Sequence, residues 1–306
     1  MRRFWAPILF VVAIWAVLAQ NPAPPAFHFV LLGDRTGEAQ PGVWEQVWKQ
    51  AAAEKPAFFL GVGDTIQGDD DAAAESQWLE AKRTLAPYAR IPLYLAPGNH
   101  DIWSPASEKL FETYTGHPPH YSFDFGAAHF TVLDNSRSDD LSAEEMAFLE
   151  ADLGRHQAQT VKFIVSHRPS WLVNAATRNS QFAFHQLARK YGVQYVIAGH
   201  VHQILHVSLD GVAYFCAPSA GGHLRASEKY EDGWFFGYTL VTVERSAVTF
   251  EIKELGAPYG KGRVTSLADW GLLGQVGHAL ACPGERSSPC YSLVQRRAGL
   301  ASVFAK

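Results

Sequence analysis

Cysteine is scarce in this sequence, with 3 in 306 residues. No Cys-x-x-Cys pair occurs, which argues against zinc-ribbon and thioredoxin chemistry, and so few cysteines cannot form a disulfide framework that supplies most of the stability. Cys216 stands in an apolar run and is expected to be a buried strand residue. Cys282 and Cys290 lie close together in a tail rich in Pro, Gly and Ser, where they could form a small loop disulfide.

The chain also lacks an excess of positive charge. Its 26 Lys and Arg against 30 Asp and Glu give a formal net charge of −4, so a role in packaging nucleic acid is not expected. Charged residues make up 18% and hydrophobic residues 47%, which fits neither a disordered chain nor a multispanning membrane protein. We therefore expect a globular protein with a large core.

The N-terminus carries an uncharged apolar run that is short for a membrane span of about 20 apolar residues. It extends from Phe4 to Ala19 behind Arg2 and Arg3 and ends in small and apolar residues. The pattern predicts a signal peptide over residues 1–19 and a secreted or periplasmic protein. An uncleaved N-terminal membrane anchor is the alternative, and only in that case is the membrane a partner. Residues 20–26 hold three prolines and are expected to form an extended linker.

Strand and helix patterns alternate from residue 27 onward. Strands are expected over residues 27–33, 57–63, 92–96, 121–125, 129–134, 162–166 and 194–198. Helices are expected over residues 42–54, 75–89 and 182–191, with two more opening at Ser104 and at a capping box, Ser142 to Glu145. From residue 204 strands follow one another directly, over residues 204–209, 212–216, 235–243 and 248–254. These patterns predict one α/β domain over residues 27–255 and an irregular C-terminal extension over residues 256–306, with a short helix near residues 266–273.

Groups that can bind a metal follow five of the apolar runs. They are Asp34, Asp64, the run Asn99-His100-Asp101, His167, and His200 with His202. Because ligands in open α/β sheets bind beyond the carboxyl ends of the strands, we expect these side chains to converge. The alternative for any one of them is an ordinary turn residue. The sequence has 13 His, and neutral imidazole is the commonest protein ligand for transition metals.

The segments that carry these groups resemble the motifs of the calcineurin-like metallophosphoesterases, which include the purple acid phosphatases. They are, in order, Gly33-Asp34, Gly61-Val62-Gly63-Asp64, Gly98-Asn99-His100-Asp101, Ser166-His167 and Gly199-His200-Val201-His202. The resemblance covers residues 27–254 and implies a four-layer αββα sandwich of two mixed β-sheets flanked by helices. It also implies a dinuclear centre of divalent or trivalent transition-metal ions (Mn, Fe or Zn) and a phosphate-ester substrate. No protein partner is evident.

The same resemblance implies a role for each group. Asp64 would bridge two ions; Asp34 and His202 would complete one site, and Asn99, His167 and His200 the other. Carboxylate, amide and imidazole ligands together suit borderline transition metals better than calcium. Two such ions can activate a bridging hydroxide for in-line attack on a phosphomonoester or phosphodiester, which predicts a metal-dependent phosphoesterase.

Some residues are candidates for contact with the substrate or for catalysis. His100 resembles the family's phosphate-contacting histidine and is expected to act as general acid, with Asp101 orienting it; a turn cap is the alternative for Asp101. Asn99, His100 and Arg35 are the candidate substrate-binding residues, Arg35 through its guanidinium, which can bind phosphate oxygens in pairs. An ordinary salt bridge is the alternative for Arg35, and Arg168 has the same two interpretations.

The sequence departs from the family pattern at two positions. Many members begin with Asp-x-His, whereas this chain has Asp34-Arg35-Thr36, and Gln67 stands where purple acid phosphatases have a tyrosine ligand. We therefore expect a looser first metal site and no charge-transfer colour. The missing histidine leaves an alternative open, a metal- or ligand-binding module with little or no turnover.

The other histidines and one acidic run are expected to be structural. His223 is the one best placed to line a substrate pocket, with a loop residue as the alternative. Residues 69–71 are three consecutive aspartates without the EF-hand spacing, which predicts a solvated turn. Specificity is expected to lie in loops over residues 102–119, 171–179 and 217–231.

Overall fold

The computed structural model describes residues 25–225, 229–272 and 274–275. The predicted signal peptide, most of the predicted linker, Cys282 and Cys290 lie outside these residues, so export and the tail disulfide stay predictions. Within the described part of the chain, no helix is both long enough and apolar enough to cross a membrane.

Two six-stranded sheets form the centre of the fold. The first has the order β12-β11-β10-β1-β2-β3, and its strands β1, β2 and β3 are parallel. The second has the order β4-β5-β6-β7-β9-β8, and its strands β5, β6, β7 and β9 are parallel. The remaining pairs within both sheets are antiparallel, so both sheets are mixed.

The strands of the first sheet are β1 (Phe27–Leu32), β2 (Phe59–Gly61), β3 (Leu93–Leu95), β10 (Gly237–Glu244), β11 (Ala247–Gly256) and β12 (Gly260–Ser266). Those of the second sheet are β4 (Tyr121–Phe125), β5 (Ala128–Val132), β6 (Val161–Val165), β7 (Tyr195–Ala198), β8 (Leu205–Leu209) and β9 (Val212–Cys216). A short pair is formed by β13 (Trp270–Gly271) and β14 (Gly274–Gln275).

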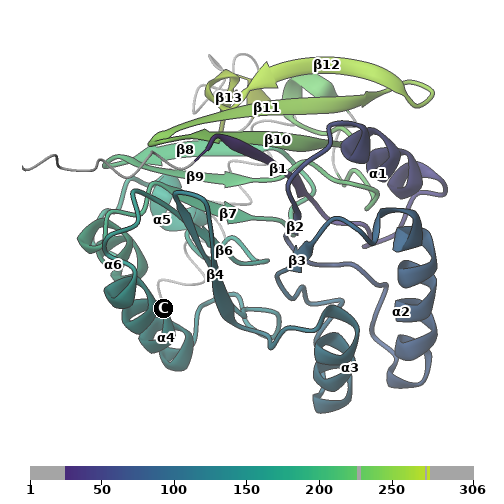
Figure 1. Cartoon of the computed structure of the whole chain (residues 1–306), viewed down its shortest axis with the longest axis horizontal. Coiled ribbons are helices and arrows are strands. Elements are labelled where there is room, and N and C mark those ends of the chain that lie inside the picture. The colour runs from purple at the N-terminus through teal and green to yellow at the C-terminus, as the bar shows by residue number, and fades with distance from the viewer. Residues whose placement is uncertain (1–24, 226–228, 273, 276–306) are drawn as a thin grey trace, which may run out of the picture.

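Helices cover the outer face of each sheet, and Figure 1 shows the two groups on opposite sides of the molecule. The first sheet is covered by α1 (Val43–Ala53), α2 (Asp71–Leu85) and α3 (Pro105–Thr115). The second is covered by α4 (Ala143–Arg155), α5 (Leu172–Ala176) and α6 (Ala183–Lys190). Short 3-10 helices lie at Ala86–Tyr88, Tyr230–Asp232 and Leu267–Asp269.

Three apolar clusters hold these four layers together. In β1, Phe29 and Leu31 point into the cluster between the sheets, whereas Val30 and Leu32 point into the cluster under α1 and α2. A strand that is buried on both faces has a continuous apolar sequence, which is the pattern seen at residues 27–33. The predicted αββα sandwich of two mixed sheets is confirmed, and Cys216 is buried in β9 as expected.

Two helix predictions need correction. Helix α2 begins at Asp71, four residues before the predicted start, because the Asp70 side chain accepts a hydrogen bond from the Ala72 amide and caps the helix. The aspartate run is thus a helix start. In α4, Ser142 caps the Glu145 amide as predicted, but the Glu145 carboxylate bonds to His120 and to the Asp134 amide, so the capping box is only half formed.

The predicted irregular extension is wrong for residues 260–266. These residues form β12, which pairs with β11 as the edge strand of the first sheet. Most of its side chains are exposed, so the strand lacks the alternation of apolar and polar residues that makes a strand visible in sequence. The helix predicted near residues 266–273 is only the 3-10 turn Leu267–Asp269, followed by β13.

Candidate metal centre

Five loops place the predicted ligands at one edge of the sandwich. Asp34, Asp64 and Asn99 follow β1, β2 and β3 of the first sheet. His167 follows β6, and His200 and His202 follow β7, of the second sheet. All five strands run parallel to a neighbour, and the two sheets pack face to face, so the loops from both sheets meet.

The first group of ligand atoms comes from Asp34, Asp64 and His202. These atoms lie within 4.8 Å of one another, and all three residues are buried. His202 Nδ1 donates to the His223 carbonyl at 2.7 Å, so the lone pair of the neutral ring is on Nε2, which lies 3.7 Å from Asp34 Oδ1. Asp34 Oδ2 has no hydrogen-bond partner among the described residues. A buried carboxylate oxygen left without a donor is a position for a cation.

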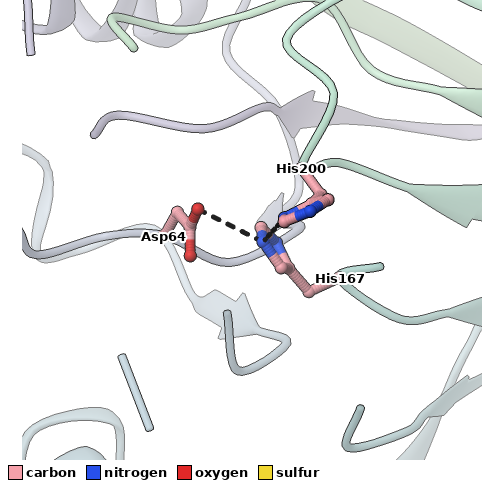
Figure 2. A group of neighbouring side chains, drawn as sticks. All are labelled: Asp64, His167 and His200. Atoms are coloured by element: carbon pink, nitrogen blue, oxygen red, sulfur yellow. Dashed lines mark hydrogen bonds and ion pairs between the residues drawn. The ribbon is translucent and has the colours of Figure 1, made fainter. Parts of the chain in front are cut away.

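The second group comes from Asp64, His167 and His200, also within 4.8 Å of one another (Figure 2). His167 Nε2 lies 3.2 Å from each of three atoms: Asp64 Oδ2, His200 Nδ1 and Asn99 Oδ1. His167 Nδ1 contacts the Val62 carbonyl at 2.8 Å, and a carbonyl can only accept, so Nδ1 carries the proton of the neutral ring. The lone pair on Nε2 therefore faces two acceptor oxygens, Asp64 Oδ2 and Asn99 Oδ1, and a cation or a second proton between them would relieve the repulsion.

The charged groups around His167 determine whether its ring carries a second proton when no metal is bound. Burial lowers the pKa of His167, but the Asp64 and Asp34 carboxylates outweigh burial and raise it to about 9. Burial and the His167 charge lower the pKa of His200 to about 3. A proton on His167 therefore stands in for the cation in metal-free protein, and metal binding would release it.

The backbone of these loops adopts uncommon conformations. Asp64, His200 and His202 have positive φ values of 57°, 69° and 59°, which non-glycine residues seldom adopt and which persist where the surroundings fix them. Gly63 has φ of 104°, and a Cβ there would lie 2.6 Å from the Gly98 amide nitrogen. The loops after β2 and β3 thus touch backbone to backbone, which requires glycine.

The donor set fits a transition-metal centre. All six predicted ligands come together, and Asp64 belongs to both groups. Two carboxylates, one amide and three imidazoles without a thiolate suit Zn, Fe or Mn. The arrangement can neutralise anionic groups and lower the pKa of water when ions are bound.

His100 lies beside this centre and is held by the backbone. Its amide donates to Asp64 Oδ1 at 3.0 Å, and its ring Nδ1 donates to the Gln67 carbonyl at 2.5 Å. The Asp69 carboxylate is 3.6 Å from the same nitrogen. Since Nδ1 is occupied, Nε2 is the nitrogen left for a substrate.

The predicted contact between Asp101 and His100 is wrong. Asp101 is fully buried, and its oxygens accept hydrogen bonds from the amides of Thr65 at 2.8 Å, Ile66 at 3.2 Å and Gly98 at 2.9 Å. Burial, followed by the Asp64 charge, raises the pKa of Asp101 to about 7 despite these donors. Asp101 therefore joins the loops after β2 and β3, and Gln67 orients His100 in its place.

Arg35 does not point toward the ligands. Its guanidinium contacts Glu80 at 2.5 Å and the Thr65 carbonyl at 3.2 Å, and it stacks over Trp44 at 4.4 Å. The salt-bridge alternative therefore describes Arg35, and the predicted substrate-binding role has no support in the structure. Arg168 is likewise paired, with Asp139 at 2.6 Å.

The two departures from the family pattern meet in space. Thr36 is buried, and its hydroxyl donates to the Gln67 side-chain oxygen. The side chains that stand in place of the family's histidine and tyrosine, Thr36 and Gln67, are therefore hydrogen-bonded to each other. This pairing leaves Asp34, Asp64 and His202 as the ligands of the first group.

Sequence reasoning missed the residues that orient the ligands. Three of them act through backbone carbonyls, at Val62, Gln67 and His223, and every residue type has a carbonyl. Asn135 is the fourth; its side-chain oxygen accepts from the amides of His167 and Arg168 at 3.1 and 3.0 Å. Val62 stands inside one of the motifs, but its residue type does not reveal the use of its carbonyl, and Asn135 lies outside every motif, so no signal in one sequence could have found these contacts.

Comparisons with known proteins agree with this geometry. A family model described as calcineurin-like phosphoesterase matches residues 27–204. Purple acid phosphatase 15 of Arabidopsis thaliana is 30% identical over 170 residues, which cover 47% of this chain and 32% of that protein. The 3',5'-cyclic adenosine monophosphate phosphodiesterase CpdA of Escherichia coli K12 is 26% identical over 201 residues, which cover 63% and 70%.

Solved structures share the fold at low identity. The purple acid phosphatase PPD1 from yellow lupin has a TM-score of 0.61 at 17% identity, covering 79% of this chain and 54% of that one. GAP50 of Plasmodium, titled as the anchor in the inner membrane complex, has a TM-score of 0.54 at 14% identity, covering 82% and 89%. The chain thus spans about a third of the Arabidopsis relative and about half of the lupin structure.

Proposed function

The chain belongs to the calcineurin-like phosphoesterase family, and we propose that it is a metal-dependent hydrolase of a phosphomonoester or phosphodiester. One observation carries the proposal: two groups of converging ligand atoms share the buried carboxylate of Asp64, directly beside His100. The similarity to proteins named as a phosphatase and a cyclic-nucleotide phosphodiesterase supports the reaction class. The substrate itself is not fixed by that similarity, because the chain covers only part of the first of them.

The chain's own residues have distinct parts in this proposal. Asp34, Asp64, Asn99, His167, His200 and His202 would hold two ions of the Mn, Fe or Zn type. Bound ions supply an activated water and neutralise charge on the phosphate. The Asn99 amide lies at the edge of the second group, 3.2 Å from His167 Nε2, where it can also contact a phosphate oxygen.

His100 is the proposed proton donor to the leaving oxygen. The Gln67 carbonyl fixes the Nδ1 proton, so a proton for transfer must come from Nε2 of the imidazolium form. A positioned general acid of this kind contributes about 10²–10⁴-fold to a rate.

A second candidate, a metal- or ligand-binding module with little turnover, rests on Thr36. Its hydroxyl is committed to Gln67, so it does not replace the histidine of the Asp-x-His pattern. The structural neighbour titled as an anchor has the same fold, and a fold alone does not specify catalysis. His100, held in place by Gln67, favours the enzyme.

Turnover of p-nitrophenyl phosphate and bis-p-nitrophenyl phosphate with added Mn²⁺, Zn²⁺ or Fe²⁺ distinguishes the two candidates. We expect hydrolysis of at least one substrate, loss of it in Asp64→Ala, and no loss in the control Glu150→Gln, which removes an exposed carboxylate paired with Lys190 outside the ligand groups. His100→Ala should slow substrates with poor leaving groups more than p-nitrophenyl esters. Absence of turnover with every metal would favour the binding module.

A further inference from the structure

A second cluster of metal-binding side chains lies away from the candidate centre. It consists of Asp124 in β4, His129 in β5 and His156 just after α4, whose ligand atoms lie within 4.8 Å of one another. Asp124 and His129 are partners across the β4–β5 ladder. His129 stands near the start of β5, whereas the candidate centre lies beyond the ends of the parallel strands. At about 3.3 Å per residue, the rest of β5 alone separates the two places by about 10 Å.

We propose that Asp124, His129 and His156 form a separate site for one divalent transition-metal cation of the Zn²⁺ type. Two imidazoles and one carboxylate are a common zinc ligand set, with a fourth position left for water. The cluster contributes no residue to the proposed hydrolysis, so this site is independent of that proposal.

The outer nitrogen of each histidine is already fixed by an acceptor. His129 Nε2 donates to the buried Asp152 carboxylate at 2.8 Å. His156 Nδ1 donates to the Asp152 carbonyl at 2.8 Å. Histidines that bind metal characteristically donate their other ring nitrogen to a carboxylate or a carbonyl, which fixes the tautomer. Asp152 supplies both kinds of acceptor.

Asp152 is itself held firmly, so it can serve as a fixed support. Its carboxylate accepts hydrogen bonds from the hydroxyls of Ser122 and Thr131, each at 2.7 Å. Burial raises the pKa of Asp152, but its bonds to His129, Ser122 and Thr131 outweigh burial and lower it to about 2. The carboxylate is therefore ionised and oriented before any ligand binds.

The ligand atoms of Asp124, His129 and His156 lie near one another. His129 Nδ1 lies 2.7 Å from Asp124 Oδ1, and the His129 and His156 rings stack with centroids 3.9 Å apart. The His129 side chain is fully buried, whereas those of Asp124 and His156 are 44% and 27% exposed. Because the two stacked rings are nearly parallel, 17° apart, metal binding requires the partly exposed His156 ring to tilt about its Nδ1–H bond to the Asp152 carbonyl and the Asp124 side chain to rotate. These movements would bring the ligand atoms to metal–ligand distances of about 2.0–2.2 Å.

Without metal, a proton takes the place of the cation. Burial lowers the pKa of His129, but hydrogen bonds to Asp152 and Asp124 outweigh burial and raise it. Metal binding then breaks the Nδ1–H bond, forms a metal–nitrogen bond on the same lone pair and releases the proton to solvent.

The test is the Zn²⁺ content of the full chain, measured by elemental analysis after equilibration with Zn²⁺ and desalting. We expect the double variant Asp124→Asn/His156→Gln to bind one equivalent less than wild type, with phosphoesterase turnover unchanged. The matched control is His120→Gln, which removes another partly exposed histidine that pairs with a carboxylate, Glu145, at 2.6 Å, and should keep the wild-type content. Equal Zn²⁺ content in wild type and the double variant would overturn the proposal.

Calorimetry in an Asp64→Ala background isolates the same site from the candidate centre. Titration with Zn²⁺ should show one site that the added pair Asp124→Asn/His156→Gln weakens by more than about 100-fold, since changes in supporting residues alone cost about 10–100-fold. An isotherm that the added pair leaves unchanged would show that the histidines serve only as structural partners of Asp152.

Discussion

Replacing Asp101 should lower the free energy of unfolding by an amount that follows from the three hydrogen bonds that its carboxylate accepts. Its carboxylate accepts from the amides of Thr65, Ile66 and Gly98, and the group is fully buried. Asp101→Ala leaves these donors without a partner, and each buried donor left unsatisfied costs about 1–3 kcal/mol. Relief of the repulsion between Asp101 and Asp64, which contributes to the raised pKa of Asp101, offsets part of that loss. We expect a net loss of about 3 kcal/mol, a large share of a typical stability of about 5–15 kcal/mol.

Asp101→Asn should destabilise the protein less than Asp101→Ala. The amide oxygen can still accept from Thr65 and Ile66, but the amide nitrogen faces the Gly98 N–H, so one bond is lost. We expect a loss of about 1 kcal/mol, the usual net worth of one such bond. Asp70→Ala, which removes the cap of α2 at the surface, is the control and should also cost about 1 kcal/mol.

The assay is denaturant unfolding of metal-free protein, alongside the pH profile of turnover in the metal-loaded protein. If Asp101 joins the two loops, Asp101→Ala should be less stable than Asp101→Asn. The limb of the pH profile that depends on His100 should stay the same in Asp101→Asn. The reasoning is refuted if Asp101→Ala unfolds like wild type, or if Asp101→Asn shifts that limb without loss of stability, because Asp101 would then act on His100.

Three other results are expected. Dialysis against a chelator should remove the ion held by Asp34, Asp64 and His202 first, leaving about one equivalent at the candidate centre by elemental analysis; two ions that stay bound after prolonged dialysis contradict the looser first site. In metal-free protein the native state binds more protons than the unfolded state above about pH 6.5, because the pKa of His167 is raised to about 9, whereas below that pH the pKa of His200, lowered to about 3, offsets that of Asp101, raised to about 7; the free energy of unfolding should therefore fall as pH rises from about 6.5 to 9, and a rise in calorimetric Tm over that range would be inconsistent. Arg35→Ala should change KM by less than about twofold and cost about 1–3 kcal/mol, because its largely buried guanidinium stacks over Trp44 and bonds the Thr65 carbonyl; a tenfold rise in KM would restore its substrate-binding role.

The sequence predicts most of the fold because strands buried on both faces and amphipathic helices leave clear patterns. The run at residues 27–33 and the stripe on α1 are of this kind. Strand β12 cannot be recognised in the sequence because it lies exposed at a sheet edge, where backbone pairing does not depend on an apolar and polar side-chain pattern. Helix α5 has five residues, too few for a helical repeat to be visible.

The ligands were predictable for a different reason: each follows an apolar strand, and parallel strands end at one edge. What the sequence does not contain is side-chain direction. Arg35 stands next to the ligand Asp34, and Asp101 stands next to His100, yet their side chains point to Glu80 and to backbone amides. Direction depends on backbone angles at single residues, such as the positive φ of Asp64 and His202, and one sequence does not record them.

The most direct test of the central claim is turnover measured against the number of ions bound, on the same sample, as metal is added back to metal-free protein. We expect no turnover without ions, turnover that rises as the groups sharing Asp64 fill, and none in Asp64→Ala at any metal concentration. Full turnover in metal-free protein, or in Asp64→Ala, would contradict it.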